Sequence, residues 1–161
     1  MNDRLWAPWR LSYVTQPKEK IAGCFVCHAD SHPDDADLLV VEQNDQTIIL
    51  VNKYPYNNGH LLICPRRHVA DLVDLTDEEQ HSIQHMLVKY VKKLRNLISP
   101  HGFNVGLNLG AAAGAGLPGH LHWHIVPRWQ GDNNFMPVVG GTKVIPQALE
   151  ELHRLLKASN E

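Results

Sequence analysis

The 161-residue sequence predicts an α+β domain built on an antiparallel sheet. Short apolar runs of strand length recur along the chain, and brief turn-forming segments separate them. One long amphipathic segment stands between the third run and the fourth. Strands joined by short connections pair antiparallel, and an intervening helix covers one face of the sheet. We therefore expect a single domain over residues 1–161, with one sheet, one long helix and a C-terminal helix.

The N-terminal segment, residues 1–37, contains few periodic stretches. Its aromatic residues predict an arm that packs through their side chains (Trp6, Pro8, Trp9 and Tyr13). Residues 31–37 are polar and acidic, which is typical of a surface loop. We therefore expect this segment to form an arm followed by a surface loop.

Five apolar runs predict the strands of the sheet. A polar turn separates the first two runs. The third run ends at Pro65, which lacks the amide hydrogen that continued pairing needs. The expected strands cover residues 38–41, 47–51, 60–64, 103–109 and 120–126.

The clearest helix is expected to begin after Thr76. Thr76 and Glu79 have the spacing of a capping box, in which each side chain binds the backbone amide of the other residue. Apolar residues then recur at spacings of three and four over about six turns, and Pro100 and Gly102 end the helix. A last helix is expected from Pro146. Its apolar stripe consists of Leu149, Leu152, Leu155 and Leu156.

Composition limits the classes of function. The formal net charge is −2 and no dense basic run occurs, which disfavours a general nucleic-acid binder. No apolar run approaches the length of a membrane span, and the N-terminus lacks the apolar core of a signal peptide. We therefore expect a cytoplasmic protein with no nucleic-acid or membrane partner. In a reducing compartment its three cysteines would serve as thiols or metal ligands.

The functional prediction depends on His120, His122 and His124. Histidines at every second position share one face of a strand, and the apolar residues between them take the other face. A glycine- and alanine-rich loop, residues 106–119, precedes them, and its backbone amides are open to phosphate oxygens. Neutral imidazole is an effective nucleophile at phosphorus near pH 7. The pattern favours chemistry at a phosphate group, although a single His-x-His pair is also typical of structural or metal sites.

The pattern His-x-His-x-His followed by two apolar residues resembles the signature of the histidine triad superfamily of nucleotide hydrolases and transferases. Residues 51–68 are similar to the first conserved half of that family. The opening Leu5-Trp6-Ala7-Pro8-Trp9-Arg10 and the late Val126-Pro127-Arg128-Trp129 resemble the bacterial branch that includes diadenosine tetraphosphate phosphorylases. The resemblance covers most of the chain. It implies a five-stranded antiparallel sheet packed on a helix, usually in a dimer.

The resemblance also implies roles for the site residues. His122 is expected to be the nucleophile that forms a covalent nucleotidyl-histidine intermediate, and His124 is expected to donate a hydrogen bond to the leaving oxygen. Asn52 stands where the family holds the nucleotide ribose, often with an acidic residue. The expected phosphate contacts are the Asn108 side chain and the amides of Gly114, Ala115 and Gly116. Either asparagine could instead only tie turns together.

A second set of residues predicts a metal site. Cys24-Phe25-Val26-Cys27 alone is a weak signal, because zinc sites and redox motifs share it. His68 and His120 complete a Cys₂His₂ set. Several bacterial and sugar-nucleotide relatives place a structural zinc at the equivalent positions. The alternatives are two reduced, buried cysteines, or His28 as a ligand.

The remaining cysteine and the basic residues receive a structural interpretation. Cys64 has no partner at metal spacing and is expected to pack in the core. Paired or solvated surface charge is favoured over phosphate binding for Arg66, Arg67, Arg128 and Lys143.

Together these features favour an enzyme that transfers a nucleotidyl group from a dinucleoside polyphosphate to phosphate or water. A structural zinc, no catalytic metal and a homodimer or higher homo-oligomer are expected. The alternatives are a nucleoside phosphoramidate hydrolase, a non-catalytic nucleotide-binding protein, and a protein whose histidine strand binds a transition metal. Phosphorolysis is favoured over hydrolysis, although Gly116 stands where phosphorylase-type relatives often carry a hydroxyl residue.

Overall fold

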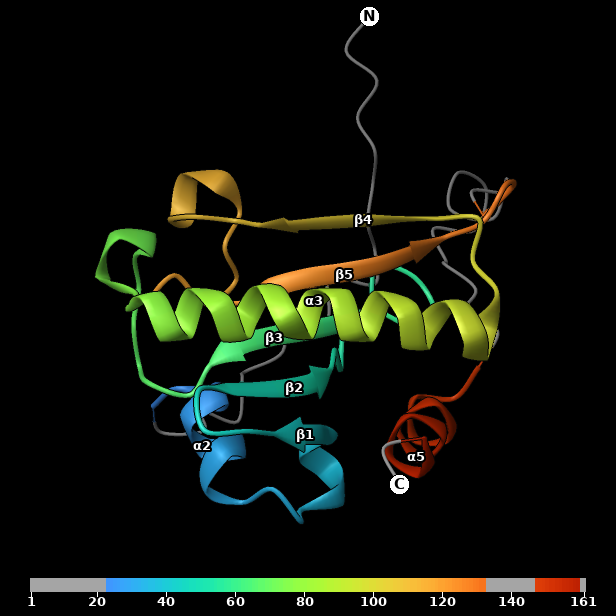
Figure 1. Ribbon diagram of the computed structural model, residues 1–161, viewed down its shortest axis with the longest axis horizontal. Helices are drawn as coiled ribbons and strands as arrows, with labels where there is room; N and C mark the ends of the chain where they lie inside the picture. Colours follow the sequence, from blue (N-terminus) through green and yellow to red (C-terminus); the bar gives the residue numbers. More distant parts are fainter. Residues whose placement is uncertain (1–22, 133–146, 160–161) are drawn as a thin grey trace, which may run out of the picture.

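The structure is a computed structural model in which residues 23–132 and 147–159 are described (Figure 1). Five antiparallel strands form one sheet in the order β1-β2-β3-β5-β4. The strands are β1 (Val40–Gln43), β2 (Thr47–Val51), β3 (Leu61–Pro65), β4 (Gly102–Leu107) and β5 (Trp123–Arg128). The expected antiparallel α+β class is confirmed.

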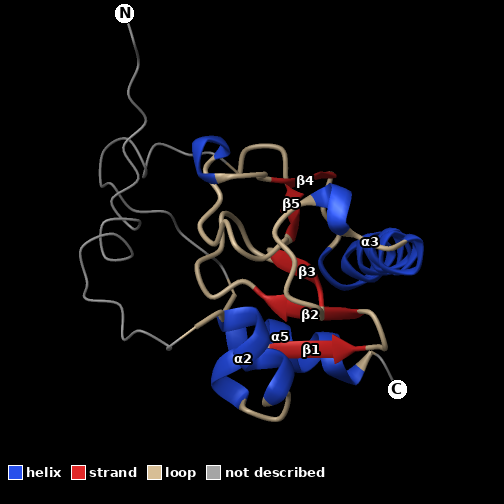
Figure 2. Cartoon of the chain, turned by 90° about the vertical axis from the view of Figure 1, so that its left-hand side faces the viewer, coloured by secondary structure: helices blue, strands red, loops and turns tan. Residues whose placement is uncertain are grey.

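The helices lie on both sides of this sheet. Figure 2 shows α3 on one side and α2 on the other. Three short 3₁₀ turns lie in the connections of the described ranges. The helices are α2 (Phe25–Ser31), α3 (Asp77–Ile98) and α5 (Leu149–Ala158), and the 3₁₀ turns are η1 (Ala36–Leu38), η2 (Leu72–Asp74) and η3 (Ala111–Ala113).

Helix α3 forms as its sequence predicts. The Glu79 amide donates to the Thr76 hydroxyl at 3.2 Å, and the Thr76 amide donates to the Glu79 carboxylate at 2.9 Å, which completes the capping box. The helix ends at Ile98, because Ser99 takes a left-handed conformation with φ of 46°. Its apolar stripe packs on the sheet, so both the helix and its buried face are confirmed.

Two apolar cores lie on opposite faces of the sheet. The larger core joins the sheet to α3 and α5, and it includes Leu121, Ile125 and Leu152. The smaller core joins the sheet to α2 and includes Val26 and Cys64, the latter fully buried as expected. Burying an aliphatic side chain contributes roughly 1.5–3 kcal/mol. Helices α2, α3 and α5 are therefore held to the sheet mainly by apolar burial.

Several expected boundaries are wrong. β1 begins at Val40, not at residue 38, because Leu38 ends η1 and Leu39 turns the chain with φ of 55°. β4 ends at Leu107, two residues early, where the chain turns into the glycine-rich loop. β5 begins at Trp123, so both His120 and His122 lie before the strand and not inside it.

The N-terminal segment also differs from the expectation. Helix α2 forms within the segment expected to be an arm, because Val26 and Ala29 lie on one helical face and are both buried. The aromatic arm at residues 6–13 lies outside the described residues. Helix α5 begins at Leu149, and Pro146 lies outside the described residues as well. In the described part of the chain, no helix combines the length and apolarity that crossing a bilayer requires.

Candidate active site and metal cluster

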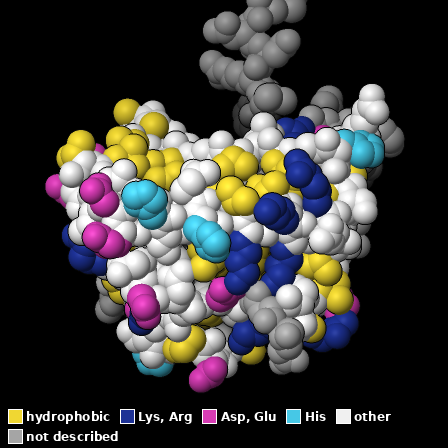
Figure 3. Space-filling view, in the orientation of Figure 1, with side chains coloured by type: hydrophobic (Ala, Val, Ile, Leu, Met, Phe, Trp, Pro, Cys, Tyr) yellow, Lys and Arg dark blue, Asp and Glu magenta, His cyan; other side chains and the backbone are white. Residues whose placement is uncertain are grey.

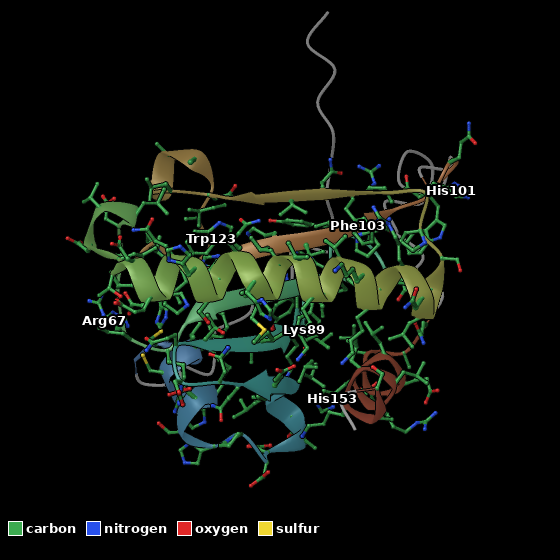
Figure 4. All side chains as sticks on the ribbon, in the orientation of Figure 1. Arg67, Lys89, His101, Phe103, Trp123 and His153 are labelled. Atoms are coloured by element: carbon green, nitrogen blue, oxygen red, sulfur yellow. The ribbon has the colours of Figure 1, made fainter. Side chains whose placement is uncertain are left out.

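The three histidines and the apolar residues between them alternate across the sheet. Leu121 and Ile125 belong to the core beneath α3. Trp123 is partly buried and packs against that core, behind α3 in Figure 4. His122 and His124 therefore project to the face opposite α3. The expected alternation holds even though β5 starts only at Trp123.

A glycine on the neighbouring strand lies next to His124. Gly106 on β4 is the register partner of His124, and a Cβ placed on this glycine would meet no atom of the described residues within 4 Å. A larger residue here would project beside the histidine ring. The glycine therefore leaves space for a ligand next to His124.

The hydrogen bond of His122 fixes its tautomer. Its Nδ1 lies 2.8 Å from the backbone carbonyl oxygen of His120. A carbonyl only accepts, so Nδ1 carries the hydrogen and a neutral ring keeps the lone pair on Nε2. The His122 ring lies 5.2 Å from the His124 ring, at 75° to it. His122 is thus held in the form that can attack through Nε2.

A fourth histidine, His60, completes the group. The Tyr56 amide donates to His60 Nδ1 at 2.9 Å, so a neutral His60 carries its hydrogen on Nε2. That Nε2–H donates to His124 Nδ1 at 2.9 Å. His124 in turn must carry its own hydrogen on Nε2. This chain of hydrogen bonds therefore makes His124 a donor through Nε2.

His124 Nε2 is buried and has no hydrogen-bond partner within the described ranges. A buried polar group without a partner is costly, and active sites are where such groups concentrate. Burial, and secondarily the nearby His122 ring, lower the pKa of His124 to about 4. At neutral pH the ring is therefore neutral, with an Nε2–H free to donate to a ligand.

The sequence does not identify His60 as a site residue and places it only at the start of the expected strand 60–64. A usable signal was present, because a single polar residue precedes a fully buried apolar strand and must find a buried partner. Gly59 fixes its position, with φ of +76° and a Cβ site only 2.7 Å from Ile98 Cδ1 and 2.8 Å from Pro127 Cγ. No other residue fits this close approach without displacing a neighbour.

Asn52 lies beside these histidines. Its Nδ2 is 3.2 Å from His60 Nδ1, and its Oδ1 accepts from the Tyr54 amide at 2.9 Å. The side chain is half-buried and ties the turn after β2. The structure therefore brings Asn52 to the histidine group, and its expected ribose contact stays a prediction.

The glycine-rich loop is folded on itself. The amides of Gly114 and Ala115 donate to the carbonyls of Ala111 and Gly110, at 3.0 and 3.3 Å. Asn108 Nδ2 donates to the Gly114 carbonyl at 3.4 Å. A phosphate would have to compete with these bonds for two of the expected amides. For Gly116, no backbone acceptor is found among residues 23–132 and 147–159.

The expected metal ligands form a compact cluster. The ligand atoms of Cys24, Cys27, His68 and His120 all lie within 4.8 Å of one another. Cys24 Sγ is 3.2 Å from His120 Nδ1, and Cys27 Sγ is 3.3 Å from His68 Nδ1. A tetrahedral zinc with bonds of about 2.0–2.3 Å needs ligand atoms roughly 3.3–3.8 Å apart. These four residues can therefore hold a metal ion.

The chemistry of the donors fits zinc. His120 Nε2 donates to the Pro65 carbonyl at 2.8 Å, which leaves the Nδ1 lone pair directed at the cysteines. Burial lowers the pKa of His120 and favours the neutral, ligating ring. Burial and the neighbouring Cys24 thiol raise the pKa of Cys27 to about 11, so a metal must displace its proton.

The alternative ligand and the basic residues lie elsewhere. The His28 ring packs against His32 with centroids 4.6 Å apart, and His28 is not part of the cluster. Arg66, Arg67 and Arg128 each pair with a carboxylate (Asp30, Glu79 and Asp132), which confirms their expected paired state. Lys143 lies outside the described residues.

A further group of basic side chains lies on the outer surface of α3 (Figure 3). It includes Lys89, whose Nζ pairs with the Glu42 carboxylate at 2.6 Å, and Lys93, which donates to the Leu156 carbonyl at 3.0 Å. Helix α3 covers the face of the sheet opposite the histidines. These charges therefore do not line the histidine site.

Three comparisons relate this chain to known proteins. The family model "HIT domain" matches residues 34–131. AP-4-A phosphorylase of Mycobacterium tuberculosis is 43% identical over 159 residues, which cover 95% of this chain and 82% of that protein. An asymmetrical bis(5'-nucleosyl)-tetraphosphatase of Schizosaccharomyces pombe is 35% identical over 82 residues, 51% of this chain and 44% of that protein. The crystal structure of a zinc-bound histidine triad family protein from Mycobacterium smegmatis matches with a TM-score of 0.69 and 26% identity, covering 85% of this chain and 92% of the other.

Proposed function

The chain belongs to the HIT domain family and is one of its enzymes, and on this premise we propose that it transfers a nucleotidyl group from a dinucleoside polyphosphate such as diadenosine tetraphosphate. One observation carries the proposal. The hydrogen bonds leave a lone pair on His122 Nε2 and a hydrogen on His124 Nε2, on rings 5.2 Å apart. A nucleophile and a donor side by side are what cleavage of a phosphoric anhydride needs. The names of the M. tuberculosis and S. pombe relatives support the substrate class.

In the first step, His122 Nε2 attacks the α-phosphorus. The N–P bond forms while the P–O bond to the polyphosphate breaks, and both electrons of that bond leave with the oxygen. His124 donates its Nε2–H hydrogen bond to this oxygen, whose charge grows as the bond breaks. The ring of His122 becomes cationic, and the His120 carbonyl holds its Nδ1–H throughout.

In the second step, an oxygen nucleophile attacks the nucleotidyl-histidine on the side opposite the N–P bond. Phosphate as the acceptor gives a nucleoside diphosphate, and water gives a nucleoside monophosphate and a proton. The electrons of the N–P bond return to His122 Nε2, which regenerates the starting ring. We propose that phosphate is the acceptor, since the M. tuberculosis phosphorylase shares 43% of its aligned residues with this chain.

The acceptor can be tested with diadenosine tetraphosphate in the presence and absence of millimolar phosphate. Phosphorolysis predicts ADP and ATP that form only when phosphate is present. The assay separates AMP, ADP and ATP by ion-exchange chromatography and follows isotopically labelled phosphate into ADP. AMP and ATP formed at a rate that phosphate does not change would identify a hydrolase.

His60 provides a test of the hydrogen-bond chain. His60→Leu should lower kcat by about 10–100-fold, because His124 loses the partner that orients it; this corresponds to ~1.4–2.8 kcal/mol of transition-state stabilisation. His101→Leu is the matched control, since His101 Nδ1 also accepts a backbone amide, that of Gln130 at 2.8 Å. Steady-state kinetics on both variants check the prediction. A His60→Leu enzyme with kcat within twofold of the control would exclude this role.

We also propose that Cys24, Cys27, His68 and His120 bind a structural zinc ion. The 4.8 Å span of their ligand atoms and the zinc-bound relative from M. smegmatis support this. Bound zinc would supply a tetrahedral cross-link between chain segments and no part of the reaction. The cross-link would join α2 to His120, whose carbonyl holds His122.

A homodimer in the cytoplasm completes the proposal. β4 is an edge strand, and its outer side pairs with no other strand in the described ranges. The apolar side chain of Val105 on this strand is 47% exposed. Edge strands with exposed apolar side chains are normally covered or paired. Pairing with the same strand of a second copy would satisfy its backbone groups. The molar mass of the protein in solution tests this assembly.

A further inference from the structure

The proposed zinc ligands come from segments far apart in the sequence, and two of them lie at the start of the short helix α2. Cys24 caps this helix and Cys27 lies in its first turn. Seven residues are too few for a helix to be stable by itself in water. Its position, and with it the position of both thiols, must therefore be set by contacts with the rest of the protein.

Outside the metal cluster, Asp30 makes polar contacts that hold α2 to the sheet. Asp30 Oδ1 accepts from Arg66 Nε at 2.7 Å and from Gln43 Nε2 at 2.8 Å. Gln43 Nε2 also donates to the Asp30 carbonyl at 2.9 Å. Arg66 is itself fixed, because its NH1 group donates to the Asn44 carbonyl at 3.1 Å. Asp30 therefore links α2 to the ends of both β1 and β3.

The location of this contact relates it to the metal cluster. Asp30 lies three residues, about one helical turn, after Cys27, and Arg66 lies two residues before His68. The ion pair and the 3.3 Å contact between Cys27 and His68 therefore join the same two chain segments. The Asp30 side chain is only 19% exposed, unlike the local Arg154–Glu151 pair on α5, where the values are 66% and 47%. A half-buried pair with fixed partners constrains geometry more than a solvated one.

We infer that Asp30 is a positioning residue for the metal site, because its contacts with Arg66 and Gln43 set the distance between the α2 thiols and His68 before a metal binds. The inference rests on the proposed zinc site. Residues outside the ligand set commonly change metal affinity by about 10–100-fold when they orient the ligands. Asp30 acts through α2 and not by touching the metal.

The test compares Asp30→Ala with Asp34→Ala in the full chain. Both variants remove one negative charge, and Asp34 is exposed in the loop after α2. Zinc release to a chromophoric chelator should be about 10–100-fold faster from Asp30→Ala and within about twofold of wild type from Asp34→Ala. Co²⁺-loaded Asp30→Ala should also lose intensity in the visible bands of a tetrahedral site. Asp30→Asn keeps an acceptor oxygen and should fall between wild type and Asp30→Ala, and it provides the measurement if Asp30→Ala does not fold.

Melting temperatures distinguish positioning from a general loss of stability. Positioning predicts that the difference between zinc-loaded and zinc-free melting temperatures shrinks in Asp30→Ala and stays at the wild-type value in Asp34→Ala. Arg66→Ala should speed zinc release similarly, and the double variant should add little to either single change. Zinc release at the wild-type rate, or an unchanged melting difference, would overturn the inference alone. Wild-type protein that holds no zinc would overturn the zinc site together with this inference.

Discussion

His122→Ala is expected to reduce kcat for diadenosine tetraphosphate by several orders of magnitude while the fold and nucleotide binding stay largely intact. The covalent step loses its nucleophile, and no other described side chain offers a free imidazole lone pair beside His124 Nε2–H. The substitution leaves the opposite face of β5 unchanged, where Trp123 and Ile125 pack against α3. The core should therefore not be disturbed.

Three measurements check this prediction. Circular dichroism and thermal melting test the fold, and calorimetry with a non-cleavable dinucleotide tests binding. Mass spectrometry of acid-sensitive intermediates, quenched at alkaline pH, should find a nucleotidyl adduct on the His122 peptide of wild type and none on the variant. A variant that keeps more than about a tenth of the wild-type kcat, a deficit of only ~1.4 kcal/mol, would show that His122 is not the nucleophile.

His124→Ala is the natural comparison for this experiment. His124 contributes a hydrogen bond and not a covalent bond, so its loss should be damaging but smaller. The loss should be least with substrates whose leaving group is a weak base, because such a group needs little stabilisation. Equal losses for all leaving groups would instead place the effect of His124 on another step.

The second large effect is expected from the metal ligands. Cys24→Ser should lower the melting temperature by about 10 °C, since losing ~4 kcal/mol shifts a domain of this size by ~2–4 °C per kcal/mol. The loss arises because α2 and the segments that carry His68 and His120 are no longer cross-linked. The kcat measured well below the melting temperature should fall less, because Cys24 touches neither His122 nor His124 in the described contacts.

Metal analysis and a cysteine control test this prediction. Wild-type protein purified without chelator should carry about one zinc per chain, as a closed four-ligand site requires. Cys64→Ala is the control, because Cys64 is a fully buried thiol outside the cluster and its loss should leave the zinc content unchanged. Freshly purified wild-type protein without zinc would refute the site. Full zinc content in Cys24→Ser would exclude Cys24 as a ligand.

The sequence predicts correctly those features that depend on residues close together in the chain. The capping box and the apolar stripe of α3 depend on spacings of three and four, which local backbone geometry converts directly into a helix and its buried face. The alternation of histidines with Leu121, Trp123 and Ile125 depends on the period of extended chain, and it survives the late start of β5. Element ends were less predictable, because Leu39 and His120 respond to contacts outside their own segments.

By itself, the sequence determined the fold class, the long helix, the buried face of β5 and the four residues of the metal cluster. Only the tertiary structure decided which nitrogen of His124 carries hydrogen, because its partner is the ring of His60 on a different segment, 64 residues away. It also decided that Asp30 meets Arg66, 36 residues away. Such contacts have no local signal in the chain, since they exist only after β3 is placed beside β5 and α2 packs beneath the sheet.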